Sequence, residues 1–198
     1  MMIDIYGASG HAKVIIEILE ELDIKINRII DDNPEKKELL GYSIFRETES
    51  NDISIAIGDN SIRYYLVNSL KDKKFPILIH PKATISKRAA IGEGTVVMAG
   101  VTINSEAQIG KHCIINTNAS IDHECTISNF VHISPNTALA GNVTVGEGTH
   151  IGIGATVIQG IKIGKWCTIG AGTVVIRDVP DYAVVVGNPG KIIKYNNV

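Results

Sequence analysis

The 198-residue chain lacks several features that would direct it to a particular class of partner. Its formal net charge of −2 gives no general attraction to nucleic acid or to an anionic membrane. It has no apolar run long enough to span a bilayer, and no basic N-terminal segment followed by an apolar core and a cleavage site. These absences favour a soluble, cytoplasmic protein with no membrane span and no nucleic-acid partner.

A regular aliphatic pattern fills the second half of the chain. Ile, Val or Leu opens each of sixteen consecutive hexads from Ile85 to Val175, and no insertion breaks the phase. A period of six fits neither the 3.6-residue period of a helix nor the two-residue period of a flat strand. It fits a chain wound into triangular coils, with three short strands in each turn. The sequence therefore predicts a parallel β-helix.

The position two residues before each aliphatic residue supports this geometry. Side chains alternate between the faces of a strand, so residues two apart both point into the prism. Most residues at this position are small, as a narrow interior requires. The three cysteines, Cys113, Cys125 and Cys167, belong to this inward column. We interpret them as buried small hydrophobic residues and expect no metal site.

The first 80 residues have a different organisation, since only four of the nineteen glycines precede residue 91. Strand patterns at residues 3–6, 26–30 and 53–57 alternate with helical patterns, the second helix carrying Ile62, Leu66 and Leu70. This order predicts a Rossmann-like βαβ domain with a parallel sheet. We expect a nucleotide-sugar-type domain at residues 1–80, the β-helix at 81–183, and a C-terminal cap and tail at 184–198.

Three candidate ligand-binding elements follow the strands of the N-terminal domain: residues 7–11, Asp31-Asp32 and residues 58–60. Ligands of open α/β sheets bind at the carboxyl ends of the strands. Glycines at a strand-to-helix turn let backbone N–H groups approach a phosphate. The spacing G-x-x-G differs from the dinucleotide pattern G-x-G-x-x-G, which argues against NAD. The three elements together favour a nucleotide-type ligand, the alternative being a turn with only a structural role.

Two histidines of the hexad region are separated by 18 residues, or one full coil. His132 and His150 each precede an inward aliphatic residue, so both should project outward and stack about 4.8 Å apart. Such a row can be functional, or it can be an ordinary polar surface or a subunit interface.

The His123-Glu124 pair is the strongest chemical candidate. Adjacent residues on a strand point to opposite faces, but a corner of the coil lets Glu124 reach the imidazole. A carboxylate on one ring nitrogen fixes the tautomer and raises the basicity of the other nitrogen. This arrangement suits a general base at neutral pH. The alternative is a water-exposed pair without a role.

These features together resemble a known family, the hexapeptide-repeat acyltransferases with a left-handed β-helix. Within it, the sequence is similar to bacterial nucleotide-sugar N-acetyltransferases of the bacillosamine and perosamine type. The resemblance covers essentially the whole chain. It rests on Gly7-Ala8-Ser9-Gly10-His11, Asp31-Asp32, Asp122-His123-Glu124-Cys125, His132, Ala140-Gly141-Asn142-Val143 and Gly187-Asn188-Pro189-Gly190-Lys191.

The resemblance implies a homotrimer that acetylates the 4-amino group of a UDP-linked amino-deoxysugar, with acetyl-CoA as co-substrate and active sites between neighbouring helices. His123 would be the base, assisted by Glu124. The resemblance places the UDP-sugar at Ser9, Gly10, His11, Asp31, Asp32, Gly58 and Asn60. It places acetyl-CoA near His132, Gly141, Ile153, Ala171 and Lys191. Asp59, where relatives often carry Asn, is a departure from the pattern.

Three other functions remain open from the sequence. Sialic-acid O-acetyltransferases share the two-domain layout. A zinc enzyme like the left-handed-helix carbonic anhydrases could use His123, His132 and His150 from adjoining subunits. A non-catalytic binding or scaffold protein is the third alternative, because solenoids often only present surfaces.

Overall fold

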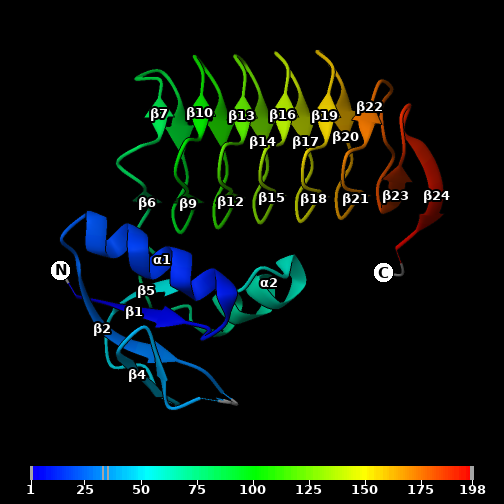
Figure 1. Cartoon of the computed structure of the whole chain (residues 1–198). Coiled ribbons are helices and arrows are strands. Elements are labelled where there is room, and N and C mark those ends of the chain that lie inside the picture. The colour runs from blue at the N-terminus through cyan, green and yellow to red at the C-terminus, as the bar shows by residue number, and fades with distance from the viewer. Residues whose placement is uncertain (1, 33, 35, 197–198) are drawn as a thin grey trace.

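The computed structural model describes residues 2–32, 34 and 36–196, so the last two residues of the predicted tail lie outside it. An N-terminal α/β domain lies along one side of a β-solenoid, and a β-hairpin closes the far end of the solenoid (Figure 1).

The N-terminal domain is a five-stranded sheet with the strand order β3-β4-β2-β1-β5. Its elements are β1 (Met2–Tyr6), α1 (Gly10–Glu21), β2 (Lys25–Ile30), β3 (Glu38–Leu39), β4 (Tyr42–Phe45), β5 (Asp52–Ile55) and α2 (Asn60–Ser69). β1 pairs in parallel with β2 and β5, which confirms the predicted parallel sheet. The antiparallel pair of β3 and β4 was not predicted. Its turn residues Leu40 and Gly41 both have positive φ, as two-residue hairpins of this kind require.

The first turn of α2 docks on backbone carbonyl groups of the solenoid through polar side chains. The buried residues of this helix are Asn60 and Arg63, whereas Ile62 is 56% exposed. Leu66 and Leu70, the other two apolar residues that indicated the helix, are partly buried and pack against a cluster of Ile53, Ile55 and Phe75. The apolar residues therefore mark only part of the buried surface of α2.

The solenoid has three faces, each a sheet of mainly parallel strands, which we number in chain order. The first face contains β6 (Leu78–Ile79), β9 (Val96–Val97), β12 (Ile114–Ile115), β15 (His132–Ile133), β18 (His150–Ile151), β21 (Thr168–Ile169), β23 (Ala183–Val186) and β24 (Lys191–Tyr195). The second face contains β7 (Thr84–Ile85), β10 (Thr102–Ile103), β13 (Ser120–Ile121), β16 (Ala138–Leu139), β19 (Thr156–Val157) and β22 (Val174–Val175). The third face contains β8 (Ala90–Ile91), β11 (Gln108–Ile109), β14 (Thr126–Ile127), β17 (Thr144–Val145) and β20 (Lys162–Ile163).

From β6 to β22, strands of one face pair in parallel with a register of 18 residues, as in the pairs His132–His150 and Ile133–Ile151. At the end of the first face, β21 pairs in parallel with β23 through Thr168 and Val184, and β23 pairs with β24 in the antiparallel direction. The aliphatic residue of each hexad points inward, and together these residues form one continuous core. All three cysteines are free and buried, in agreement with their predicted inward position. Residues 78–79 already pair with β9, so the first solenoid strand lies just before residue 80.

The corners between the faces repeat one backbone feature every six residues. The residue at this position has a positive φ, and the series is Gly94, Gly100, Glu106, His112, Asn118, Glu124, Phe130, Asn136, Asn142, Gly148, Gly154, Gly160, Trp166 and Gly172. A positive φ is costly for residues other than glycine and asparagine, by about 1–2 kcal/mol. Glu124, His112, Phe130 and Trp166 adopt it nonetheless. Large side chains at these corners therefore need a compensating role in packing or chemistry.

We name the three corners by what they carry. The reactive corner lies between the second and third faces and carries His123 and Glu124. The docking corner lies between the third and first faces and carries His112, Phe130, Gly148 and Trp166. The Ile153 corner lies between the first and second faces and carries Ile153 and Ala171.

The N-terminal domain covers the first face and the docking corner. Val96, Met98 and Ile114 of the first face share a buried apolar cluster with residues of α1 and the sheet, including Ile15 and Leu19. The first face is thus an internal interface of the chain. The corner between the second and third faces points away from the N-terminal domain (Figure 1).

Candidate active site

The reactive corner brings His123 and Glu124 into contact, as the sequence predicted. The His123 Nδ1 atom lies 2.9 Å from Glu124 Oε2, and both side chains are more than half exposed. The positive φ of 60° at Glu124 rotates the chain so that two successive side chains lie on one side. With Nδ1 bonded to the carboxylate, Nε2 is the ring nitrogen that can accept a proton from a substrate.

Two neighbours hold this pair in place. The Asp122 carboxylate accepts hydrogen bonds from the His123 backbone N–H and the Asn104 side chain, both at 2.8 Å. These hydrogen bonds lower the pKa of Asp122. Gly141 lies one coil further along, against the ring, where an added Cβ would be 2.4 Å from His123 Cε1. Gly141 therefore makes room for the imidazole.

The predicted strand-end elements of the N-terminal domain do converge. The Ala8 backbone N–H donates to Asp31 Oδ2 at 3.1 Å, and the Tyr6 hydroxyl donates to Asp32 Oδ1 at 2.6 Å. Burial and the bond to Asp32 raise the pKa of Tyr6 to about 12, so the phenol stays a hydrogen-bond donor at neutral pH. Gly7 has φ of +112°, and a Cβ there would lie 2.8 Å from Ala56 O. This glycine allows the ends of β1 and β5 to approach closely.

The two helices of this domain differ at their N-termini. Asp59 caps α2 by accepting hydrogen bonds from the backbone N–H groups of Ser61 and Ile62, both at 2.9 Å. At α1 the N-cap residue Ser9 makes no such side-chain bond, and both Ser9 and Gly10 are exposed. Open N–H groups and the positive end of the helix dipole favour an anion. The start of α1 is thus the candidate phosphate site.

Three histidines meet where the strand ends face the solenoid. The rings of His132 and His150 stack with centroids 4.7 Å apart, close to the predicted spacing. Both side chains are half-buried beside the N-terminal domain, and His150 lines the cavity next to α2, so the row is not an open polar surface. His132 Nε2 lies 3.2 Å from Asn116 Nδ2, and His150 Nε2 lies 2.8 Å from Ser134 Oγ.

Burial keeps these rings uncharged. Burial is the main cause that lowers the pKa of His11 to about 4 and that of His132 to about 3, and the positive charge of Arg63 adds to both shifts. The pKa of His150 is also lowered, for the same two reasons. His11 Nε2 and His132 Nδ1 are buried and form no hydrogen bond of normal geometry within the described chain. They are candidate contacts for a bound molecule.

The predicted cofactor-binding residues are spread over the solenoid. Gly141 lies at the reactive corner, whereas Ile153 and Ala171 lie at the Ile153 corner, where Ile153 is 53% exposed. His132 lies on the covered first face, and Lys191 begins the exposed closing strand β24. A single chain does not bring these five residues into one pocket.

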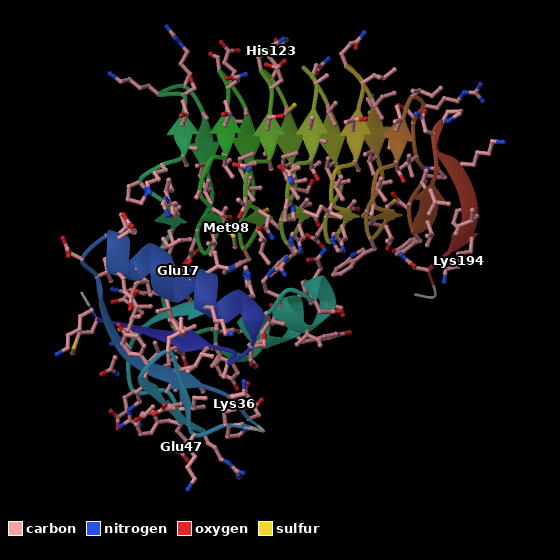
Figure 2. All side chains as sticks on the ribbon, in the orientation of Figure 1. Glu17, Lys36, Glu47, Met98, His123 and Lys194 are labelled. Carbon is pink, nitrogen blue, oxygen red and sulfur yellow. The ribbon has the colours of Figure 1, made fainter. Side chains whose placement is uncertain are left out.

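His123 is also remote from the ligand-binding elements of its own chain. Figure 2 shows His123 on the edge of the solenoid that points away from the N-terminal domain. The strand ends with Gly10, Asp31 and Gly58 lie on the opposite side. The two groups of residues therefore do not form one site within a single chain.

A cavity of about 610 Å³ lies between the start of α2 and the docking corner. Gly58, Asp59 and Asn60 line it on one side, and Trp166 and Tyr182 line it on the other. The predicted residues Gly58 and Asn60 are thus beside a cavity, whereas its aromatic walls were not predicted. Trp166 and Tyr182 stand apart from the other candidate residues in the sequence, so the sequence did not mark them as part of a site.

Within residues 2–32, 34 and 36–196, no group of three or more His, Cys, Asp or Glu side chains is arranged to hold a metal ion. His123 lies at the reactive corner, whereas His132 and His150 lie in strands of the first face, so these three histidines do not converge in one chain. Neither α1 nor α2, the helices in the described part of the chain, is long and apolar enough to cross a membrane.

Comparison with known proteins defines the class of the fold. Residues 2–70 match the protein family described as "PglD N-terminal domain". Residues 142–177 match the family described as "Bacterial transferase hexapeptide (six repeats)". The two together describe a left-handed β-helix transferase with an α/β domain in front, which confirms the predicted fold class.

Two solved structures match nearly the whole chain. A histidine mutant of perosamine N-acetyltransferase from Caulobacter crescentus, in complex with CoA and GDP-perosamine, is 39% identical, with a TM-score of 0.94 over 98% of this chain and 97% of that one. The acetyltransferase domain of PglB from Neisseria gonorrhoeae FA1090, in complex with acetyl coenzyme A, is 36% identical, with a TM-score of 0.91 over 97% and 98% of the two chains. The chain belongs to this family of hexapeptide-repeat sugar N-acetyltransferases, which confirms the resemblance.

A curated relative is named after a UDP-linked sugar, whereas the Caulobacter crescentus structure contains a GDP-linked sugar. UDP-N-acetylbacillosamine N-acetyltransferase from Bacillus subtilis (strain 168) is 43% identical over an alignment of 117 residues, and the match covers 48% of this chain and 50% of that relative. This match therefore spans only half the length of the relative.

Proposed function

We propose that this chain transfers the acetyl group of acetyl-CoA to the 4-amino group of a UDP-linked amino-deoxysugar. The observation that carries the proposal is the 2.9 Å contact between His123 Nδ1 and the Glu124 carboxylate on an exposed corner. Family membership supports acetyl transfer, and the name of the Bacillus subtilis relative supports a UDP-linked acceptor.

The chemical step requires a neutral amine, because an ammonium group has no lone pair. His123 Nε2 removes a proton as the amine attacks the thioester carbonyl, and Glu124 stabilises the resulting imidazolium. The C–N bond forms, the C–S bond breaks, and the proton passes to the departing CoA thiolate. The products are the acetamido sugar and free CoA thiol. Positioning of the two substrates supplies the rest of the rate enhancement.

The nucleotide sugar would bind at the strand ends of the N-terminal domain. The uncapped start of α1, with Ser9 and Gly10, supports a diphosphate at that point. Asp31 and Asp32 would accept hydrogen bonds from the nucleoside. His11, Gly58 and Asn60 lie further toward the solenoid, where the sugar would extend.

The complete site would form between two copies in a homotrimer. The distance of His123 from the strand ends of its own chain supports this arrangement, since a neighbouring copy has to supply one of them. Acetyl-CoA would then lie between the reactive corner of one copy, with Gly141, and the Ile153 corner of the next, with Ala171. Lys191 would lie at one end of this groove, whereas His132 lies on the first face, away from both corners. Closed cyclic symmetry gives every copy the same pair of contacts.

A thiol-release assay tests the proposal. Purified protein is incubated with acetyl-CoA and UDP-linked or GDP-linked 4-amino sugars, and free CoA thiol is measured together with the mass of the sugar product. Sialic acid and the corresponding 4-hydroxy sugars serve as acceptors for O-acetylation. The proposal predicts the fastest thiol release and a mass gain of one acetyl group with a UDP-linked amino sugar. Thiol release only with hydroxyl acceptors would contradict the proposal. The absence of thiol release with every acceptor in the panel would contradict it as well.

A further inference from the structure

Arg63 is the largest fully buried side chain at the junction of the two domains. It lies in the first turn of α2 and is only 1% exposed. A buried guanidinium usually pairs with a carboxylate. Within the described chain, however, all six hydrogen bonds of Arg63 go to oxygen atoms of backbone carbonyls and of one amide side chain.

Half of these bonds fold the turn that ends β5. Arg63 Nη1 donates to the carbonyl oxygens of Ile57, Gly58 and Asp59 at 3.0, 3.3 and 3.5 Å. Gly58 belongs to the third candidate ligand-binding element. The guanidinium thus fixes the backbone of that element from behind.

The other bonds tie this turn to the solenoid. Arg63 Nε donates to His112 O, and Nη2 donates to Phe130 O, both at 2.9 Å. Nη2 also donates to Asn60 Oδ1 at 2.7 Å, and Asn60 Nδ2 donates to Gly148 O at 2.9 Å. His112, Phe130 and Gly148 occupy the same place in three successive coils. Arg63 and Asn60 together therefore bind a ladder of three carbonyl groups along the docking corner.

We propose that Arg63 is a positioning residue for the acceptor substrate. Its hydrogen bonds fix the position of the turn carrying Gly58 and Asn60 relative to the first face of the solenoid. Gly58 of this turn lies next to the His132 ring in β15, one of the candidate contacts for a bound molecule. Neither contact with the substrate nor contact with acetyl-CoA is part of this role.

The chemistry of the side chain explains why an arginine is needed. Its planar fork directs donors toward both domains at once, which the single ammonium group of a lysine cannot reproduce. Burial lowers the pKa of Arg63 only to about 10, so the group remains charged at neutral pH. His11 faces Arg63, and His132 faces His150, Arg63 and His11. The positive charge of Arg63 therefore disfavours protonation of both rings.

The test uses the full-length protein with Arg63→Lys and Arg63→Gln, and Arg88→Gln as a control that removes one exposed arginine. The first readout is the Michaelis constant for each substrate, which rests on the proposed acetyl transfer. We expect both Arg63 variants to raise the Michaelis constant for the nucleotide sugar by about tenfold or more, the effect of misplacing a bound group. The constant for acetyl-CoA and the values for Arg88→Gln should stay within about twofold of the unmodified chain.

The second readout is independent of any enzymatic activity. NMR titration of labelled histidine rings in the protein without ligands should show His11 and His132 gaining protons at higher pH in Arg63→Gln than in the unmodified chain. In Arg63→Lys the retained positive charge should limit this change. A chain with no acetyltransferase activity but with these shifts would refute the proposed function alone.

Three results would overturn the inference. The first is a folded Arg63→Lys variant with an unchanged Michaelis constant for the nucleotide sugar and unchanged histidine titrations. The second is an equal rise of both Michaelis constants, which indicates a general loss of structure. The third is failure of both Arg63 variants to fold while Arg88→Gln folds, which would reduce Arg63 to a structural residue.

Discussion

The reactive corner and the docking corner have the same backbone geometry but differ in exposure and in the contacts of their side chains. Glu124 and Phe130 are six residues apart, and their φ angles are 60° and 59°. Glu124 is exposed and bonds the imidazole of His123, whereas Phe130 is 7% exposed and packs against His112 and Tyr64. The solenoid thus offers equivalent corners, and the domain that covers one of them decides which corner can carry chemistry.

The largest expected effect is on catalysis at the reactive corner. Replacing His123 by alanine should lower kcat by about 10²–10⁴-fold, the typical contribution of a general base. The thermal midpoint should change little, because the side chain is more than half exposed. Gln159→Ala changes the same corner position two coils further on and is the matched control. Near-normal turnover of the His123 variant would remove the proposed role of this residue.

The second effect is on stability at the docking corner. Phe130→Ala should lower the free energy of unfolding by roughly 3–5 kcal/mol, because it empties a buried aromatic site. Glu124→Ala, at the same backbone position of the other corner, should stay within about 0.5 kcal/mol. Urea unfolding of the two variants measures the difference directly. Equal losses in both variants would mean that the two corners are not used differently.

Two glycines sharpen the comparison. Gly141→Ala should reduce turnover with little loss of stability, because the added methyl meets only the exposed His123 ring and displaces it. Gly148→Ala should instead destabilise the fold, since Gly148 has φ of +67° and a Cβ there would lie 2.4 Å from the Trp166 ring. Activity assays and thermal midpoints of both variants test this. The opposite pattern of losses would contradict the assignment of the corners.

The smallest effect is a dependence of stability on pH from the docking corner. Burial lowers the pKa of His112 to about 4, while the unfolded chain binds a proton near pH 6.5. The unfolded state therefore holds more protons between these values, and stability falls as the pH drops from about 6.5 toward 4. His112→Asn fits the positive φ and should flatten this slope. An unchanged slope in urea titrations at pH 7, 6 and 5 would count against a neutral His112.

The sequence was sufficient for features that depend on local geometry. The hexad period predicted the solenoid because every coil repeats the same inward pair, and it predicted the stacking of His132 on His150. The contact between His123 and Glu124 was also predictable, because a corner reorients two successive side chains. These features need no knowledge of the other domain.

Features that depend on the docking of the two domains were not predictable. Nothing in the hexads marks the first face as the covered one, so His132 and His150 could not be assigned to an internal interface. Arg63 was missed because its partners are backbone carbonyls, which every residue has. The apolar residues of α2 predicted a helix correctly, but they did not predict that Asn60 and Arg63 are its buried residues.

The central claim is that His123 of one copy serves the nucleotide site of another, and mixing two inactive variants tests it most directly. His123→Ala removes the base, and Gly10→Asp puts a carboxylate where a phosphate would bind, in space that is open in the structure. Gly10→Ala is the control for the added side chain. Co-expression of the two inactive chains should restore about one quarter of the sites in a randomly mixed ring. A mixture as inactive as either variant alone would show that base and nucleotide site belong to the same chain.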